Sequence, residues 1–172
     1  MQKQYDVVIL GGGLAGLTLS LQLKKSKPDI SILILEKRAT EAATAAHKVG
    51  ESTVELGSYY LREVLGLKKY LEGDELPKHG LRFFFKSNNK ADIANRVELG
   101  PRESLPVPSH QLDRGTLENE LMRRSKELGC EVVLGARVKD VSFSTDGNEV
   151  IYFLNKEEQK ANGKWIADAS GR

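Results

Sequence analysis

Apolar and polar positions at the start of the chain predict a β-α-β unit. Residues 7–10 form a short apolar run with β-branched side chains, bounded by glycine, which is typical of a strand buried on both faces. A second apolar run at residues 32–35 indicates another strand. Between them we expect a helix that ends before Pro28, because proline cannot continue it. The apolar stripe of this helix consists of Leu14, Leu17 and Leu21.

The middle of the chain predicts different elements. An alanine-rich stretch after the second strand fits either a loop or a short helix. Ser52 and Glu55 have the spacing of a capping box, which predicts a helix over residues 53–65. A strand is expected at residues 81–86, which are rich in phenylalanine, and three prolines keep residues 101–111 extended.

The last third of the chain predicts a helix followed by antiparallel strands. Asp113 can cap a helix that runs to about residue 128, because its carboxylate accepts hydrogen bonds from the first free N–H groups. Turns are expected at residues 146–148, where Asp-Gly-Asn favours a hairpin, and over the polar residues 155–163. The expected strands are residues 131–134, 137–144, 150–154 and 164–169.

The turn after the first strand has the spacing of a dinucleotide-binding motif. Gly11 and Gly13 would turn the chain tightly and let a pyrophosphate approach the backbone, and Gly16 would let the helix pack closely on the strand. The free N–H groups of the helix then face the phosphates, so the anion needs no basic side chain. Glu36 ends the second strand, 20 residues after Gly16, where an acid accepts hydrogen bonds from a ribose. Because strands, helix and acid agree, we interpret the turn as a dinucleotide site.

The order of the elements separates this chain from a nicotinamide dehydrogenase. Such an enzyme would continue with further β-α-β units after Glu36, whereas here a loop, a helix and antiparallel segments follow. The nucleotide site is therefore expected within another α/β architecture.

Composition and charge narrow the class of protein further. The chain has 172 residues, is 40% hydrophobic and 29% charged, and so can form a globular domain with a real core. A net charge of +2 gives no reason to expect nucleic acid as a partner. Three features predict a cytoplasmic location. Cys130 is the only cysteine, no apolar stretch is long enough to span a membrane, and the first strand leaves no room for a signal peptide.

The histidines lack the spacing of a metal site and are expected at the surface or lining a pocket. They are His47, His79 and His110.

Five segments carry a resemblance to a known family. They are residues 6–16 with 35–38, residues 48–52, residues 112–121, residues 135–140 and residues 167–172. Together they resemble FAD-dependent monooxygenases of the glutathione-reductase-like superfamily, and within it the flavin-dependent halogenases and the geranylgeranyl-reductase-like proteins. Many relatives have proline where Leu14 stands, a difference that should matter little because the backbone meets the phosphate there.

The resemblance implies an α/β fold: an FAD/NAD(P)-binding Rossmann-like domain of the glutathione-reductase type with part of an antiparallel substrate sheet. Residues 1–172 are then an incomplete FAD-binding domain, in which about 75–112 contribute to a substrate-side subdomain. Lys78 matches the segment that carries the halogenases' catalytic lysine, whose amine takes up or hydrogen-bonds hypohalous acid; the alternative is a solvated lysine before a strand. By motif and resemblance, the residues expected to bind FAD are Gly11, Gly13, Leu14, Ala15, Gly16, Glu36, Lys37, Arg38, Gly50, Arg114, Val138, Asp168 and Ala169.

The expected function is that of an FAD-binding oxidoreductase. Its reduced flavin would activate oxygen for hydroxylation or halogenation of a small organic substrate, with a flavin reductase or NAD(P)H as the source of electrons. One alternative is a flavin-dependent reductase of prenyl or other double bonds. The other is an FAD-binding module without turnover. The sequence indicates neither the substrate nor the oligomeric state.

Overall fold

A computed structural model describes residues 4–45, 47–86, 92–103, 106–145 and 147–171. The chain divides into two compact units. The first unit consists of Met1–Lys48 and Asp113–Arg172, and the second unit of Val49–Leu112. The predicted hairpin turn at residues 146–148 lies partly outside the described residues, because Asp146 is not among them.

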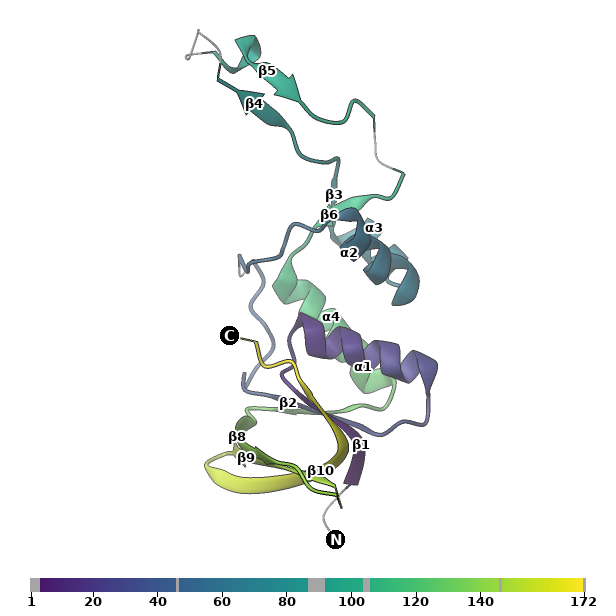
Figure 1. The fold of residues 1–172 in the computed structure, drawn as a ribbon, viewed down its shortest axis with the longest axis vertical. Helices are drawn as coiled ribbons and strands as arrows, with labels where there is room; N and C mark the ends of the chain where they lie inside the picture. The colour runs from purple at the N-terminus through teal and green to yellow at the C-terminus, as the bar shows by residue number, and fades with distance from the viewer. Residues whose placement is uncertain (1–3, 46, 87–91, 104–105, 146, 172) are drawn as a thin grey trace. The chain divides into compact units, whose positions relative to one another are not determined.

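The first unit is built on a six-stranded sheet with the order β7-β2-β1-β10-β9-β8 (Figure 1). β1 pairs in parallel with β2 on one side and with β10 on the other, and β2 pairs in parallel with β7, whereas β9 and β8 continue the sheet in antiparallel fashion. The carboxyl ends of the parallel strands therefore meet at one edge. The strands are β1 (Gln4–Leu10), β2 (Ile32–Glu36), β7 (Glu131–Leu134), β8 (Arg137–Ser142), β9 (Asn148–Leu154) and β10 (Glu157–Asp168).

Two helices, α1 (Leu14–Ser26) and α4 (Arg114–Glu127), lie side by side on this sheet (Figure 1). The hydroxyls of Ser20 and Ser125 join them across their contact, with an Oγ–Oγ distance of 2.9 Å. The predicted β-α-β unit is confirmed, since β1 and β2 flank α1 and nearly all of their apolar side chains are buried. The predicted cap of the later helix is confirmed as well, because the Asp113 carboxylate accepts the N–H groups of Gly115 and Thr116.

The polar turn expected over residues 155–163 is wrong. Only Asn155 and Lys156 form the turn, both with positive φ, as a two-residue hairpin with the right-handed twist of its strands requires. β10 then runs for 12 residues, pairing first with β9 and then with β1. The first four residues of β10 are polar and exposed, so they carried no apolar alternation from which a strand could be predicted.

The second unit contains short helices and two separate two-stranded sheets. The capping box predicted at Ser52 and Glu55 is wrong, because Ser52 forms a β-bridge with Gln111, and the helix begins only at Glu55 without a side-chain cap. The predicted helix is also interrupted, since its second half has π-helical hydrogen bonding. The elements are α2 (Glu55–Tyr59), the π-helix η1 (Tyr60–Val64), α3 (Lys68–Asp74), β3 (Leu76–Lys78), β4 (Phe83–Phe85), the 3-10 turn η2 (Ile93–Asn95), β5 (Val97–Leu99) and β6 (Ser109–Gln111).

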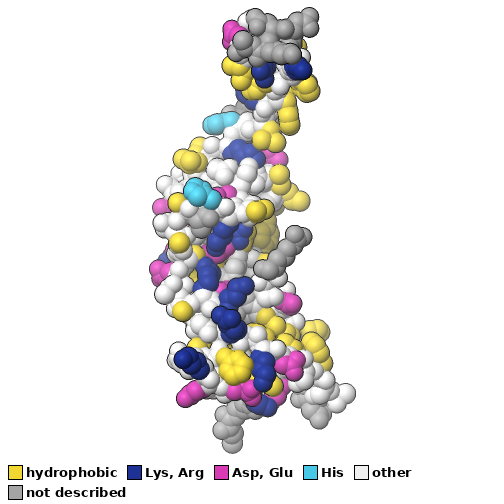
Figure 2. All heavy atoms as spheres, turned by 90° about the vertical axis from the view of Figure 1, so that its left-hand side faces the viewer, with side chains coloured by type: hydrophobic (Ala, Val, Ile, Leu, Met, Phe, Trp, Pro, Cys, Tyr) yellow, Lys and Arg dark blue, Asp and Glu magenta, His cyan; other side chains and the backbone are white. Residues whose placement is uncertain are grey.

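The antiparallel ribbon of β4 and β5 exposes large apolar side chains on both of its faces. In Figure 2 hydrophobic side chains, in yellow, project on both sides of the molecule at the height of this ribbon, at the top of the view. An isolated two-stranded ribbon is marginally stable at best, and three or more strands with a covered face are needed for independent stability. The exposed apolar side chains are Phe83, Phe84, Phe85, Val97 and Leu99.

Among the described residues no helix is long and apolar enough to cross a membrane.

Candidate cofactor site

In the glycine loop after β1, each glycine of the motif meets a different structural requirement. A Cβ on Gly11 would lie 2.4 Å from the carbonyl oxygen of Ala169, and Gly11 has a φ of +108°. A Cβ on Gly16 would lie 2.0 Å from the carbonyl oxygen of Gly11, so only glycine lets α1 approach the loop so closely. Gly13, in contrast, has no atom within 4 Å of the Cβ position, and its φ of −87° suits any residue. The bare backbone at Gly13 therefore faces open space in which a phosphate can approach it.

The N-terminus of α1 offers backbone donors to that space. Gly13 is the N-cap, no side chain caps the helix, and its first turn contains no acidic residue. The first N–H groups of a helix have no intrahelical partner and carry a partial positive charge, so this end of α1 suits an anion. The predicted phosphate contacts at Leu14, Ala15 and Gly16 belong to this first turn.

Glu36 ends β2 as a buried carboxylate beside the glycine loop. Its Oε2 accepts the N–H of Gly12 at 2.6 Å, and its Oε1 accepts the N–H of Arg38 at 2.8 Å and the Nε of Arg38 at 3.2 Å. Burial opposes ionisation, but these N–H groups and the Arg38 guanidinium outweigh it and hold the pKa of Glu36 below its ordinary value. The acid is thus ionised, and Oε2 keeps a lone pair for a hydroxyl such as that of a ribose.

A pocket of about 140 Å³ opens beside Glu36. It brings together four of the predicted cofactor residues, which come from the loop after β1, the end of β2 and β8. Arg137 and Ser170 also line it and were not predicted, because nothing in the local sequence indicates that β8 lies across from the end of β10. The predicted residues in the pocket wall are Gly11, Glu36, Lys37 and Val138.

The end of β10 contributes both backbone and a carboxylate to this edge. The N–H of Ala169 donates to the carbonyl of Leu10 at 2.8 Å, which places Ala169 against the glycine loop. The carboxylate of Asp168 accepts both the hydroxyl and the N–H of Ser170, and these bonds lower the pKa of Asp168. Asp168 is exposed and ionised at the carboxyl end of β10.

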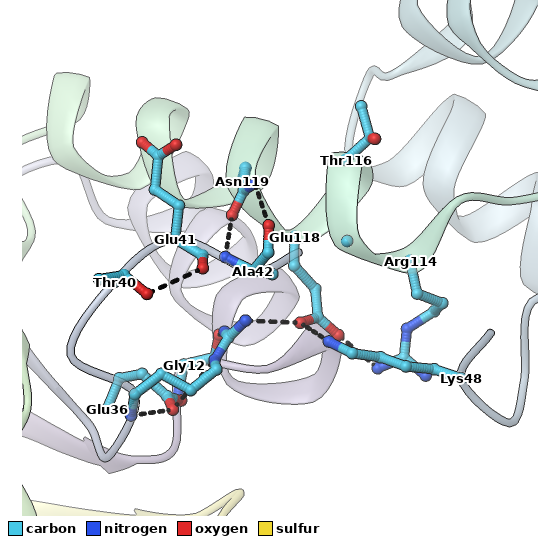
Figure 3. Close-up of polar contacts among 12 residues, drawn as sticks. Gly12, Glu36, Thr40, Glu41, Ala42, Lys48, Arg114, Thr116, Glu118 and Asn119 are labelled. Carbon is cyan, nitrogen blue, oxygen red and sulfur yellow. Dashed lines mark hydrogen bonds and ion pairs between the residues drawn. The ribbon is translucent and has the colours of Figure 1, made fainter. Parts of the chain in front are cut away.

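A cluster of charged side chains lies next to the glycine loop, and sequence reasoning missed its centre. Glu118 is only 1% exposed, and its carboxylate contacts Nζ of Lys48 at 2.6 Å, a terminal nitrogen of Arg114 at 2.6 Å and a terminal nitrogen of Arg38 at 3.5 Å (Figure 3). Arg38 also donates to the carbonyl of Gly12 at 3.0 Å. The four-residue spacing of Arg114 and Glu118 on a predicted helix was the available signal.

The alanine-rich segment after β2 is a loop rather than a helix, and α4 holds it. Asn119 makes two hydrogen bonds with the backbone of Ala42, and Asp113 accepts the N–H of Ala45 (Figure 3 shows the Asn119 pair). Ala45 and His47 have positive φ, which is uncommon for residues other than glycine. The loop is therefore fixed by side chains of α4 and of its N-cap rather than by its own backbone preference.

Two predicted site residues belong to the second unit. Gly50 is exposed there with a φ of +92°. Lys78 ends β3, is half-buried, and its Nζ donates to the carbonyl of Thr53 at 2.7 Å. One predicted surface or pocket residue of this unit is instead part of the core, since His110 is 3% exposed and its Nδ1 lies 2.8 Å from the hydroxyl of Ser58. Burial lowers the pKa of His110.

No group of three or more metal-ligating side chains is found in the part of the chain that the structure describes.

The parallel strands end at a glycine loop, a helix N-terminus and an ionised acid, and the antiparallel strands β8 and β9 continue their sheet. These features define an FAD/NAD(P)-binding Rossmann-like domain. Comparison with known families narrows this class. The chain belongs to the family described as FAD binding domain, which matches residues 4–172, and its cofactor is FAD.

Known relatives and solved structures agree with this family. A flavin-dependent halogenase of Dictyostelium discoideum is 29% identical over 193 residues, covering 99% of this chain and 32% of that protein. An L-2-hydroxyglutarate dehydrogenase of Indibacter alkaliphilus is 33% identical over 121 residues, covering 68% of this chain and 28% of that protein. The structure of a myxobacterial chondrochloren halogenase, an FAD-dependent halogenase, superimposes with a TM-score of 0.78 at 26% identity and covers 98% of this chain and 38% of that one. The chain thus spans about a third of the length of these proteins.

Proposed function

We propose that this chain is the FAD-binding part of a halogenase-like oxidoreductase that acts on a small organic molecule. The observation that carries the proposal is the open, uncapped N-terminus of α1 behind Gly13, beside the ionised Glu36 and the pocket. The halogenase relatives cover nearly the whole chain, which supports halogenation over other flavin chemistry. The L-2-hydroxyglutarate dehydrogenases support a second candidate, simple oxidation of a hydroxy acid.

Each part of the site would then have one task. Bound FAD supplies the redox chemistry, and the protein supplies its position, the charges around it and the exclusion of water. The N–H groups at the start of α1 would bind the pyrophosphate, and Glu36 would accept a ribose hydroxyl. The backbone of Val138, in the pocket wall, would read the adenine. Arg38 and Arg114 would face the anionic middle of the cofactor.

The charge of Glu36 should be needed for FAD affinity. We expect Glu36→Gln to raise the Kd for FAD about tenfold or more, because it weakens a charge-assisted hydrogen bond worth about 1.5–3 kcal/mol. Quenching of flavin fluorescence during titration measures the Kd. Glu41→Gln is the matched control, since Glu41 is an exposed acid only five residues along the chain. Equal affinities for the two variants and the wild type would remove Glu36 from the site.

We also propose that residues 75–112 contribute to a substrate-side subdomain. The exposed apolar faces of β4 and β5 support this, because such a ribbon needs further strands or a substrate-binding face to cover it. Electrons would come from a flavin reductase or from NAD(P)H. A cytoplasmic location is proposed from the single cysteine, Cys130, which is buried and forms no disulfide.

The role of Lys78 is a separate proposal, supported by its resemblance to the halogenase lysine and by its half-buried amine. Only one of the three ammonium donors of Lys78 is used by the Thr53 carbonyl, so the amine could still hold hypohalous acid. We expect Lys78→Ala to reduce halogenation to background while FAD content and flavin reoxidation stay at wild-type levels. The assay uses the longest natural protein that contains this chain, with halide, a flavin reductase and a panel of aromatic substrates, and reads product mass.

The control for this experiment is Lys68→Ala, which removes an exposed lysine of the same unit. Halogenated product at the wild-type rate from Lys78→Ala would exclude the proposed role. Equal, mild losses in both variants would assign Lys78 to the packing of β3 alone.

A further inference from the structure

We propose that Glu118 is a positioning residue, whose buried carboxylate holds Arg38, Lys48 and Arg114 at the places where they meet the phosphates of the cofactor. This inference rests on the proposed FAD site. It concerns a residue that no motif of the chain singles out and that does not itself face the pocket beside Glu36.

The first argument is geometric. The three cations come from three separate segments: Arg38 follows β2, Lys48 ends the loop after it, and Arg114 begins α4. Oε1 of Glu118 accepts a hydrogen bond from the guanidinium of Arg114, and Oε2 accepts one from the amine of Lys48 (Figure 3). Oε2 also lies 3.5 Å from the guanidinium of Arg38. One carboxylate therefore accepts hydrogen bonds from two flexible side chains and lies within ion-pair distance of a third.

The second argument is electrostatic. The Glu118 side chain is 2% exposed, and a carboxylate so deeply buried is tolerated only when it is paired and hydrogen-bonded. Conversely, the three cations, which are only partly exposed to solvent, would repel one another if they were brought together without it. The side chains of Arg38, Lys48 and Arg114, taken with the carboxylates of Glu36 and Glu118, have a formal charge of +1, a sign that favours an anion.

The third argument links the cluster to the glycine loop. Arg38 contacts Glu118 through one terminal nitrogen, Gly12 through the other, and Glu36 through Nε. Gly12 in turn donates its N–H to Glu36. The Arg38 guanidinium thus connects Glu118 to the glycine loop that would bind the pyrophosphate, and moving Glu118 should also move this loop.

A substitution that removes the charge of Glu118 but keeps the shape of its side chain separates positioning from simple electrostatics. Glu118→Gln makes the cluster more positive, so a purely electrostatic effect would tighten the binding of anions. Loss of positioning should instead weaken the binding of FAD and ADP about tenfold, the equivalent of one charge-assisted hydrogen bond. The affinity for adenosine, which has no phosphate, should stay within about twofold, a change below the value of a single hydrogen bond.

Competition of ADP and adenosine with FAD, followed by flavin fluorescence, measures these affinities. The matched control is Glu120→Gln, which removes an acid of the same helix that pairs with Arg123 and Arg124 instead. Tighter or unchanged ADP binding by Glu118→Gln would overturn the proposal, and so would an equal loss for ADP and adenosine, which indicates general damage to the fold. A wild-type chain that binds none of the three ligands would instead overturn the proposed function.

A second variant covers the case in which Glu118→Gln does not fold. Glu118→Asp keeps the charge but withdraws the carboxylate by one methylene, so it should weaken ADP binding and leave adenosine unchanged. A second readout needs no ligand: the amine of Lys48 should be acetylated faster in either folded variant than in the wild type, with the exposed Lys126 as internal reference. Unchanged ADP affinity in Glu118→Asp, or unchanged labelling of Lys48, would count against the proposal.

Discussion

Replacing Gly13 with valine should abolish FAD binding and leave the fold intact. A Cβ at Gly13 meets no atom within 4 Å, and the φ of −87° suits a β-branched residue, so the protein itself does not oppose the change. The added methyl groups would occupy the space through which the phosphates reach the N–H groups of α1. Loss of two phosphate hydrogen bonds, about 1.5–3 kcal/mol each, corresponds to an increase in Kd of about 100-fold or more.

Flavin fluorescence titration measures this loss, and the thermal unfolding midpoint without cofactor shows whether the fold is intact. The control is Gly57→Val, since Gly57 lies in α2 of the second unit and is equally free of close neighbours. FAD bound by the Gly13 variant with wild-type affinity would refute the placement of the pyrophosphate at this loop.

Replacing Gly16 with alanine should have the opposite outcome, a loss of stability of the fold itself. The new Cβ would lie 2.0 Å from the carbonyl oxygen of Gly11 and 3.0 Å from Cγ2 of Ile9. A backbone atom cannot turn aside as a flexible side chain can, so α1 would have to move away from β1. We expect the free energy of unfolding to fall by about 3 kcal/mol or more, at the upper end of overpacking effects.

Urea denaturation followed by far-ultraviolet circular dichroism measures that change. Gly13→Ala is the control, because it adds the same methyl group three residues earlier in an open position. The two glycines should thus separate ligand binding from stability within one loop. Equal stabilities of the Gly16→Ala variant and the wild type would show that the close approach of α1 to the loop is dispensable.

The parts of the fold that could be predicted are those determined by local sequence. The apolar runs of β1 and β2, the glycine spacing and the Asp113 cap each act over a few residues, and the structure confirms all of them. Two other segments were mispredicted. Ser52 was assigned to a cap but pairs with Gln111, a partner distant in sequence. The first residues of β10 were assigned to a turn but pair with the adjacent β9, because they are polar and carry no apolar alternation.

In the candidate site, too, contacts within a local motif could be predicted, whereas contacts between distant residues could not. Its backbone part follows from the motif, whereas the pairing of Glu118 with Lys48 joins residues 70 positions apart. From its residue type alone, Glu118 is expected at the surface of the helix. The structure instead buries it among cations. The predicted contacts of Gly50 and Lys78 with the site stay predictions, because both residues belong to the second unit.

The double pairing of β10 has a consequence for the order in which the protein folds. β8, β9 and the first half of β10 are joined by short turns, so they can form early from contacts that are near in sequence. The second half of β10 pairs with β1, and Gln4 lies opposite Asn162, so this pairing closes almost the whole length of the chain into one loop. Ala169 reaches Gly11 only after that closure. The cofactor loop is therefore synthesised before β10 but completed only when β10 pairs with β1, so a nascent chain cannot assemble this part of the FAD site before β10 has left the ribosome.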